Sequence, residues 1–216
     1  MKKNVLKCAF ACLVIVVLFQ IGIGNAQADM MFDFELFSTG VDDNCDVLTE
    51  GTTDTHWTIA ASPGGAANAI VQTPFAGWLG HQTNSRWIGS TTNGSDFVTP
   101  GTYDYEMNFD LTGFVPESAV ITGNFLSDDS AEIFVNDMTT SISGGGFVSL
   151  TAFTLNSGNS TFNAGINTLR FRVNNAAVGD NPSGLQVEFT AATAIPEPSS
   201  FALFGVLGLG IFKRRR

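Results

Sequence analysis

Basic residues are scarce in this sequence. It holds ten Lys and Arg against twenty Asp and Glu, and seven of the ten lie in the first seven or last four residues. Between Asp29 and Ile195 only Arg86, Arg170 and Arg172 are basic, whereas no acidic residue precedes Asp29. A domain this acidic repels phosphate backbones, so we expect no nucleic-acid partner.

Cysteine is also rare. Of the three cysteines, Cys8 and Cys12 lie in an N-terminal segment that we expect to be removed, which leaves Cys45. A disulfide framework within the mature chain is therefore excluded. Two interpretations stay open: Cys45 is a thiol in the loop that follows Asp42, or it bridges two chains.

The residue patterns of common hydrolases are missing. The two histidines, His56 and His81, belong to no His-Glu-x-x-His motif, and no Gly-x-Ser-x-Gly motif occurs. Asp128, Asp129 and Glu132 offer carboxylates for acid–base work, but no second acidic site is identifiable. We therefore predict that the protein is not an enzyme. The alternative is a secreted hydrolase that acts on polysaccharide.

The N-terminus has the three parts of a secretory signal peptide. Three lysines within the first seven residues precede an uncharged apolar stretch, Cys8–Gly24, and Ala26 and Ala28 form a small-x-small cleavage site. We expect signal peptidase to remove a signal helix, residues 1–28, and to leave Asp29 as the first residue. An uncleaved anchor helix is the alternative. Both early cysteines lie too far forward for a lipoprotein.

The C-terminus, residues 195–216, has three parts in order. Pro196, Glu197 and Pro198 come first, Phe201–Phe212 is apolar, and the chain ends in Lys213, Arg214, Arg215 and Arg216. Two prolines around one residue predict an extended, solvent-exposed backbone. With two serines, the apolar run reaches roughly 20 Å against a hydrocarbon core of ~30 Å, so it predicts a short, marginal membrane helix. The basic end favours the cytoplasmic side.

This order of parts resembles the PEP-CTERM sorting signal of Gram-negative envelope proteins. The resemblance implies that an exosortase, a membrane protease-transpeptidase, cuts near Pro196-Glu197-Pro198 and releases the protein or attaches it at the cell surface. It also implies a transient membrane anchor and a location on the cell envelope or in the extracellular matrix. The alternative is a plain C-terminal membrane anchor.

The stretch between the two ends, residues 29–194, alternates apolar and polar residues with period two between turn residues. This pattern predicts antiparallel strands and one all-β domain, a jelly roll or β-sandwich. The expected strands are Phe32–Leu36, Trp57–Ala60, Ala69–Gln72, Arg86–Ser90, Thr102–Leu111, Ala119–Leu126, Ala131–Asn136, Phe147–Leu155, Thr168–Asn174 and Leu185–Thr190. The expected core includes Phe109, Phe134, Phe153, Leu169, Phe171, Val173 and Val187.

Part of this domain resembles the galactose-binding-like jelly roll of carbohydrate-binding modules. An acidic turn, Ser127–Ser130, leads into the strand Ala131–Asn136, and an Ala-Gly-x-Asn-x-Leu turn at Ala164–Leu169 enters the strand Phe171–Asn175. The chain departs from that pattern at Asp137, where glycine is usual. The resemblance implies the fold, and it implies contact with polysaccharide more weakly.

Ligand residues are predicted from residue type. Trp78 lies in a glycine-flanked loop and is a candidate ring for sugar stacking, whereas Trp87 flanks an alternating strand and is expected in the core. Asp128 and Asp129 are further ligand candidates. The acids near them, or those at residues 42–46, offer the hard oxygen ligands that Ca²⁺ takes, although no complete calcium loop occurs. We expect no cofactor, with a structural Ca²⁺ as the alternative.

Overall fold

The alternating segments form antiparallel strands in the computed structural model, which describes residues 31–176 and 178–197. The strands are β1 (Phe32–Asp33), β2 (Thr53–Ala61), β3 (Ala67–Val71), β4 (Ile88–Gly89), β5 (Gly101–Asp110), β6 (Val120–Asp128), β7 (Ser130–Val135), β8 (Met138–Gly144), β9 (Thr151–Leu155), β10 (Ile166–Asn175) and β11 (Gly184–Ala194). Within the described residues the one helix is the short 3-10 turn η1 (Pro116–Ser118). The prediction of an all-β fold is confirmed.

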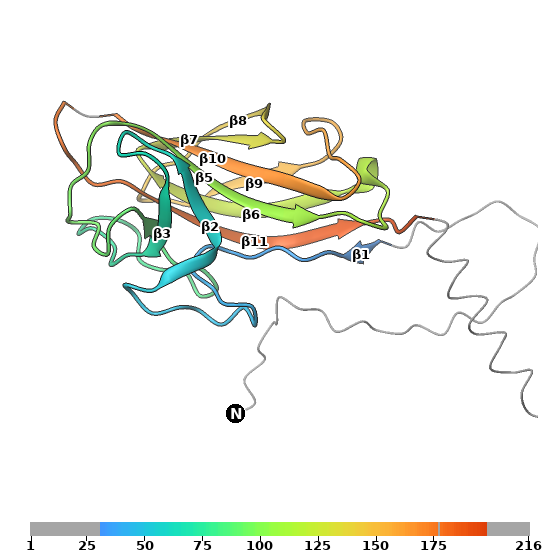
Figure 1. Ribbon diagram of the computed structural model, residues 1–216, viewed down its shortest axis with the longest axis horizontal. Coiled ribbons are helices and arrows are strands. Elements are labelled where there is room, and N and C mark those ends of the chain that lie inside the picture. The colour runs from blue at the N-terminus through green and yellow to red at the C-terminus, as the bar shows by residue number, and fades with distance from the viewer. Residues whose placement is uncertain (1–30, 177, 198–216) are drawn as a thin grey trace, which may run out of the picture.

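The strands form two layers. Hydrogen bonds connect them in the order β8-β7-β10-β5-β2-β3-β4-β11-β6-β9, with β1 attached to β11, and every pair of named strands is antiparallel. The path turns between β3 and β4, so that β7, β10 and β5 lie over β6, β11 and β9 (Figure 1). This arrangement is the predicted antiparallel β-sandwich.

The core fills the space between the layers. Phe171 of β10 is fully buried, and its ring centroid lies 5.5 Å from that of Phe125 on β6 and 5.7 Å from that of Phe153 on β9. One ring therefore contacts two strands of the facing layer, and edge-on packing of this kind suits aromatic cores. The predicted core is confirmed for Phe109, Phe153, Leu169, Phe171, Val173 and Val187.

Phe134 corrects one core prediction. Its side chain is half-buried and lies on the outer face of β7, where the guanidinium carbons of Arg170 and Arg172 lie 4.9 and 5.1 Å from the ring centroid. Arg172 also pairs with Asp104, with Nε 2.7 Å from Oδ1. The two cations cover the ring from outside, so a large aromatic residue is accommodated without entering the core.

Four segments differ from the predicted strands. The strands expected at Phe32–Leu36 and Arg86–Ser90 are reduced to the two residues of β1 and of β4, and the one expected from Phe147 begins only at Thr151. The edge strand β8 was not predicted. Its one buried residue is Thr140, so it lacks the alternating apolar residues by which strands are recognised.

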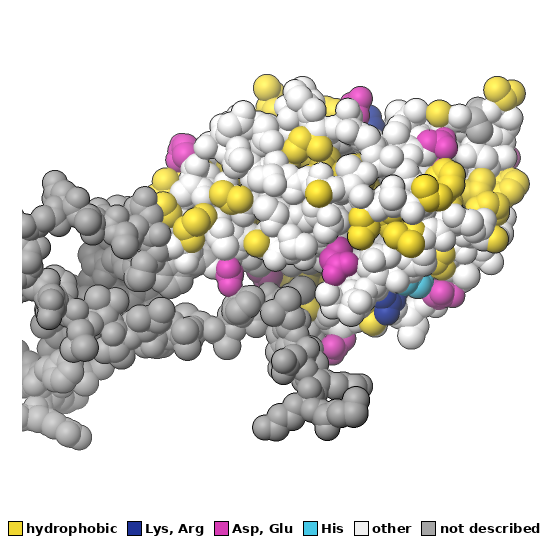
Figure 2. Space-filling model, turned by 180° about the vertical axis from the view of Figure 1, so that it is seen from behind, with side chains coloured by type: hydrophobic (Ala, Val, Ile, Leu, Met, Phe, Trp, Pro, Cys, Tyr) yellow, Lys and Arg dark blue, Asp and Glu magenta, His cyan; other side chains and the backbone are white. Residues whose placement is uncertain are grey.

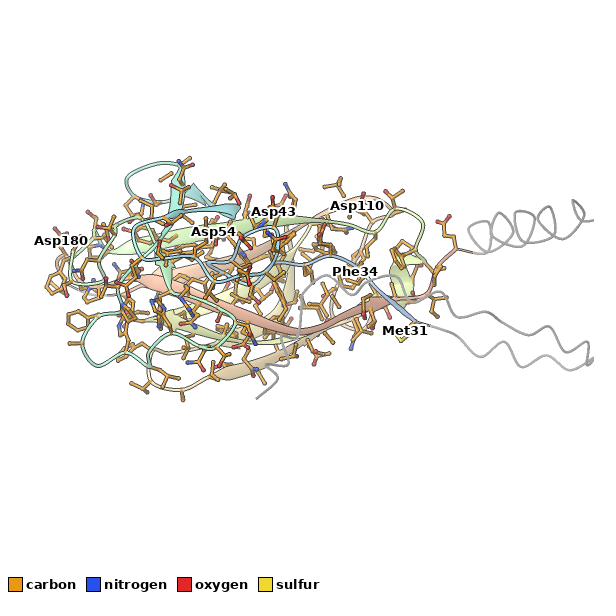
Figure 3. All side chains as sticks on the ribbon, turned by 90° about the horizontal axis from the view of Figure 1, so that it is seen from below. Met31, Phe34, Asp43, Asp54, Asp110 and Asp180 are labelled. Atoms are coloured by element: carbon orange, nitrogen blue, oxygen red, sulfur yellow. The ribbon has the colours of Figure 1, made fainter. Side chains whose placement is uncertain are left out.

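Both ends of the described chain leave the sandwich at the same end. β1 pairs with the last residues of β11, and Met31 lies toward the end opposite to Asp180 (Figure 3). We call the end with the termini the tail end and the other the distal end. The predicted signal helix with Ala26, Ala28 and Asp29, and the predicted membrane helix, lie outside the described residues. No helix in residues 31–176 and 178–197 is long and apolar enough to cross a membrane.

Candidate functional site

A long segment between β3 and β5, residues 72–100, covers the distal end. It is mostly irregular, so its backbone groups need partners outside a regular sheet. The amide of Gln72 donates to Trp87 O (2.9 Å), that of Leu79 to Phe147 O (2.6 Å) and that of Val98 to Asn181 O (2.8 Å). These bonds fix the segment against itself and against two other loops.

Four aromatic rings of this segment contact one another in series. The ring centroids of Phe97 and Phe75 lie 6.1 Å apart, those of Phe75 and Trp78 6.2 Å, and those of Trp78 and Trp87 4.2 Å. Phe97 is 55% exposed, Phe75 is half-buried, Trp78 is 8% exposed and Trp87 is fully buried. The series therefore runs from solvent to the interior, and buried rings support the exposed one.

Other apolar side chains extend this surface. Hydrophobic side chains gather at the end of the molecule remote from the termini (Figure 2). We define the distal apolar surface as Phe75, Leu79, Phe97, Phe147 and Val148. Leu79 and Val148 are exposed, and Phe75 and Phe147 pack against the cluster of Trp78, Trp87 and Leu126. The contacts join rings and aliphatic groups from two loops into one surface.

Polar groups flank the exposed ring. Val98, next to Phe97, exchanges backbone hydrogen bonds of 2.8 and 3.1 Å with Asn181. This bridge brings the loop that carries Asp180 beside the segment that carries Asp96 and Phe97. Residues with amide and carboxylate side chains therefore adjoin Phe97 along the chain and across the bridge, and such a mixture suits a ligand with both hydroxyl and C–H groups.

Trp78 and Asp128, two of the predicted ligand residues, bond to each other. The Trp78 indole nitrogen donates to Asp128 Oδ2 at 2.8 Å, and Asp128 is 5% exposed. Gly184, which pairs with Asp128, leaves room for the Gln72 amide and the indole ring, since a Cβ there would clash with Gln72 Nε2 and lie 3.1 Å from the ring. Burial raises the pKa of Asp128 to about 7, and the carboxyl of Asp129 acts in the same direction, whereas the Trp78 bond lowers it.

The structure alters the expected roles of these residues. Trp87 lies in the core, as predicted. Trp78 is buried, so it does not present the exposed ring face that its glycine-flanked position suggests. Asp129 is half-buried and accepts a hydrogen bond from the Ala176 amide at 2.8 Å. Phe97 was missed, although a large aromatic residue among the turn residues 91–100 was a usable signal.

The other acidic residues predicted as ligands do not form a cluster. Glu132 lies on the outer face of β7 in register with Arg172, away from the buried Asp128. Asp42 Oδ1 accepts bonds from the amides of Asn44 and Asp46, each 2.9 Å long. In the part of the chain that the structure describes, no three His, Cys, Asp or Glu side chains are placed to hold one metal ion.

A hollow of about 420 Å³ lies beside the edge strand β8. Residues 138–141 and 157–161 line it. Apart from Met138 and Gly158 they carry hydroxyl or amide side chains, and none of them is charged. It is a second surface of suitable chemistry for an uncharged polar ligand.

The first residues of the Pro-Glu-Pro triplet are attached to the tail end of the sandwich. Phe114 and Pro196 form an isolated antiparallel bridge, with Val115 N donating to Ile195 O and Glu197 N to Gly113 O, each at 2.8 Å. The backbone is extended here, as predicted. Pro196 and Glu197 are half-buried, however, so the predicted full exposure is wrong for these two residues. Pro198 and Lys213–Arg216 lie outside the described residues.

Comparison with known proteins identifies the C-terminal segment. Residues 194–216 match the model of the PEP-CTERM protein-sorting motif. No curated protein matches the chain.

Two solved structures are similar to the chain. One is a family 35 carbohydrate binding module from an environmental isolate, 14% identical, covering 66% of this chain and 98% of that chain with a TM-score of 0.31. The other is the CBM36-1 domain of a multidomain xylanase from the hindgut metagenome of Trinervitermes trinervoides, 14% identical, covering 64% of this chain and 90% of that chain with a TM-score of 0.25.

The sorting motif begins where the last strand of the sandwich ends. The chain is therefore an antiparallel β-sandwich that carries a C-terminal PEP-CTERM motif, the mark of an exported, exosortase-sorted cell-surface protein.

Proposed function

We propose that this protein is a non-enzymatic surface or matrix protein whose distal apolar surface contacts a neutral extracellular polysaccharide. The observation that carries the proposal is the exposed ring of Phe97, supported by Phe75, Trp78 and Trp87 at the end of the sandwich opposite to the sorting motif. A molecule held by its tail would present this end to the extracellular matrix.

The chemistry of the surface suits a sugar. The face of an aromatic ring packs against the C–H groups of a pyranose, and adjacent amide and carboxylate groups accept its hydroxyls. Because buried rings hold Phe75 and Phe97 in place, little side-chain entropy is lost on binding. Asp96 precedes Phe97 in the chain, Asp180 precedes Asn181 across the bridge, and the whole domain is acidic, so an uncharged polymer is favoured over an anionic one.

The two ends of the chain would direct export and sorting of the protein. Signal peptidase would remove residues 1–28 during export. The short apolar run would hold the tail in the membrane, with Lys213–Arg216 on the cytoplasmic side, until the exosortase cuts it. Anchoring is then transient, and the acidic domain leaves for the surface or matrix.

A non-enzymatic role fits the position of Asp128. A pKa of about 7 suits a general acid, but Asp128 is 5% exposed and bonded to Trp78. A catalytic acid has to lie within hydrogen-bond reach of its substrate. The buried carboxyl therefore serves the fold in this proposal.

A glycan array on the mature surface protein tests the proposal. We expect weak binding to neutral glycans and a loss of about tenfold for Phe97→Ala, since one packed ring contributes on the order of 1.4 kcal/mol. Ile166→Ala is the matched control, because Ile166 is 63% exposed and begins β10 at the tail end. No binding across a broad panel, with and without Ca²⁺, would contradict the proposal.

A second variant separates the two candidate surfaces. Ser157→Trp places a large side chain in the hollow beside β8. Binding should persist in this variant. Loss of binding in Ser157→Trp together with full binding in Phe97→Ala would move the site to β8.

A further inference from the structure

The sorting motif follows the sandwich without a spacer. β11 ends at Ala194, and Ile195 and Glu197 then hydrogen-bond to the segment 113–118. Pro196 is opposite Phe114 in a bridge whose two hydrogen bonds belong to the residues on either side. A proline fits there because neither hydrogen bond of the bridge uses an amide hydrogen at that position. The domain therefore holds the start of the motif in one defined conformation.

Ser118 completes this contact. Its hydroxyl donates to Val115 O at 2.6 Å and accepts from Ile195 N at 2.8 Å. The amides of Ile195 and Glu197 and the carbonyl of Ile195 are thus all bonded to the domain. Ile195, Pro196 and Glu197 are each half-buried. We call residues 195–197 with 113–118 the tail clamp.

A protease needs free backbone on its substrate. It commonly binds an extended peptide by adding it as a strand, which uses the same amide and carbonyl groups that the clamp already occupies. The folded sandwich also lies directly beside residues 195–197 and would collide with the walls of an active-site cleft. The clamped residues are therefore poor positions for the scissile bond while the domain is folded.

We infer that the exosortase cuts this chain on the C-terminal side of Glu197, so that the mature protein keeps the tail clamp. The inference rests on the proposed exosortase processing. In the cut, a peptide C–N bond breaks and its carbonyl carbon bonds to the oxygen of water or to an amine nitrogen of an envelope acceptor. The departing nitrogen takes a proton and becomes the amino terminus of the released tail.

Intact-mass analysis of the surface-located protein, expressed as the full chain, tests this inference. We expect a mass that includes Glu197 and lacks Lys213–Arg216. A mature chain that ends at or before Pro196 would overturn the inference and leave the proposed sorting intact. A mature chain that extends to Arg216 would overturn exosortase processing itself, and the inference with it.

A disulfide lock provides an independent test. Val115 N donates to Ile195 O beside the Phe114–Pro196 bridge, so the two residues lie opposite each other. Opposed residues of antiparallel strands have Cα atoms about 4.5–5.5 Å apart, within the range of a disulfide. Val115→Cys with Ile195→Cys, in a Cys45→Ser background, should form this bond in the oxidising envelope and leave Pro196-Glu197-Pro198 unchanged.

If the cut lies beyond Glu197, the locked protein should be processed within about twofold of the wild-type rate. The two single-cysteine variants in the same background are the controls. Accumulation of unprocessed chain in the locked protein alone would show that the clamp has to open before cleavage, and would overturn the inference.

Discussion

The indole N–H of Trp78 donates a 2.8 Å hydrogen bond to the carboxyl of Asp128, 50 residues away. Both side chains are buried. Asp128 ends β6, and the chain crosses to the other layer at the next residue. The bond therefore fastens the segment that carries the aromatic series to the point where the layers meet.

The raised pKa of Asp128 should make the fold weaker as pH rises. The folded chain keeps a proton that the unfolded chain, with an ordinary pKa of 3.8, gives up. The protonated carboxyl stabilises the fold fully below about pH 4. This stabilisation is lost as the pH rises to 7, and the loss in the free energy of unfolding is about 2–4 kcal/mol. Asp128→Asn removes the titration and keeps an oxygen for Trp78. Urea melts should then show a smaller difference in the free energy of unfolding between pH 5 and pH 8 than the wild type shows.

Asp110→Asn is the control for that experiment. Asp110 is exposed, and hydrogen bonds from Thr112 lower its pKa. Its titration is therefore complete well below pH 5. Asp110→Asn should keep the wild-type difference in the free energy of unfolding between pH 5 and pH 8. Equal pH dependence in Asp128→Asn and the wild type would show that Asp128 is ionised in the fold.

Substitution of Trp78 should destabilise the domain, contrary to what a loop position suggests. Trp78→Phe removes the indole donor and leaves a buried carboxyl short of a partner, which costs about 1–3 kcal/mol. Trp78→Ala also removes the ring that packs on Trp87 and should cost about 3–5 kcal/mol. Urea melts near pH 7 measure both. A change below about 0.5 kcal/mol for Trp78→Phe would mean that the hydrogen bond does not stabilise the fold.

The two faces of the β7–β10 pair should respond differently to loss of a ring. Phe171→Ala should cost roughly 3–5 kcal/mol, because the ring is fully buried between the layers. Phe134→Ala should cost about 1 kcal/mol or less, since it loses an outer ring and its cation contacts. Similar losses in urea melts would contradict the assignment of inner and outer faces.

Replacing Pro196, Glu197 and Pro198 with alanines should block processing and leave membrane insertion unchanged. The apolar run and Lys213–Arg216 remain, so a slightly heavier form should accumulate in the membrane fraction. Intact mass decides the result. The control is Asp180→Ala with Pro182→Ala, a similar acidic and proline pair at the distal end, outside both the motif and the tail clamp. Normal removal of the tail from the triple variant would show that the triplet is not the recognised element.

Long alternating segments made the sandwich predictable. β5 and β10 pair over ten residues each, and their inward side chains could be read from the sequence with period two. β8 could not, because it is an edge strand with one buried side chain. The alternation in Ala131–Asn136 places Phe134 on the face opposite to Ile133 and Val135, and the structure agrees. The error came from assuming that a phenylalanine has to be inside, whereas two arginines cover it.

The candidate site was less predictable, because it depends on contacts between distant segments. Glycines beside Trp78 indicate a turn in the backbone but say nothing about what covers the ring. Its bond to Asp128 and the support it gives Phe75 exist only once the segment between β3 and β5 is folded onto β6. Likewise, the prolines of the motif predict an extended chain, and only the tertiary structure shows that it bonds to Gly113 and Val115.

The pairing of β11 also determines how the molecule would bear mechanical load. The tail continues directly from β11, which is hydrogen-bonded to β6 along most of its length and to β1 at its last residues. A pull between a held tail and a polymer at the distal end would run parallel to these strands. The bonds to β6 would then be loaded together in shear instead of opening one after another. The rate at which these strands separate under load is then the rate of forced unfolding, which depends on the height of the barrier to unfolding.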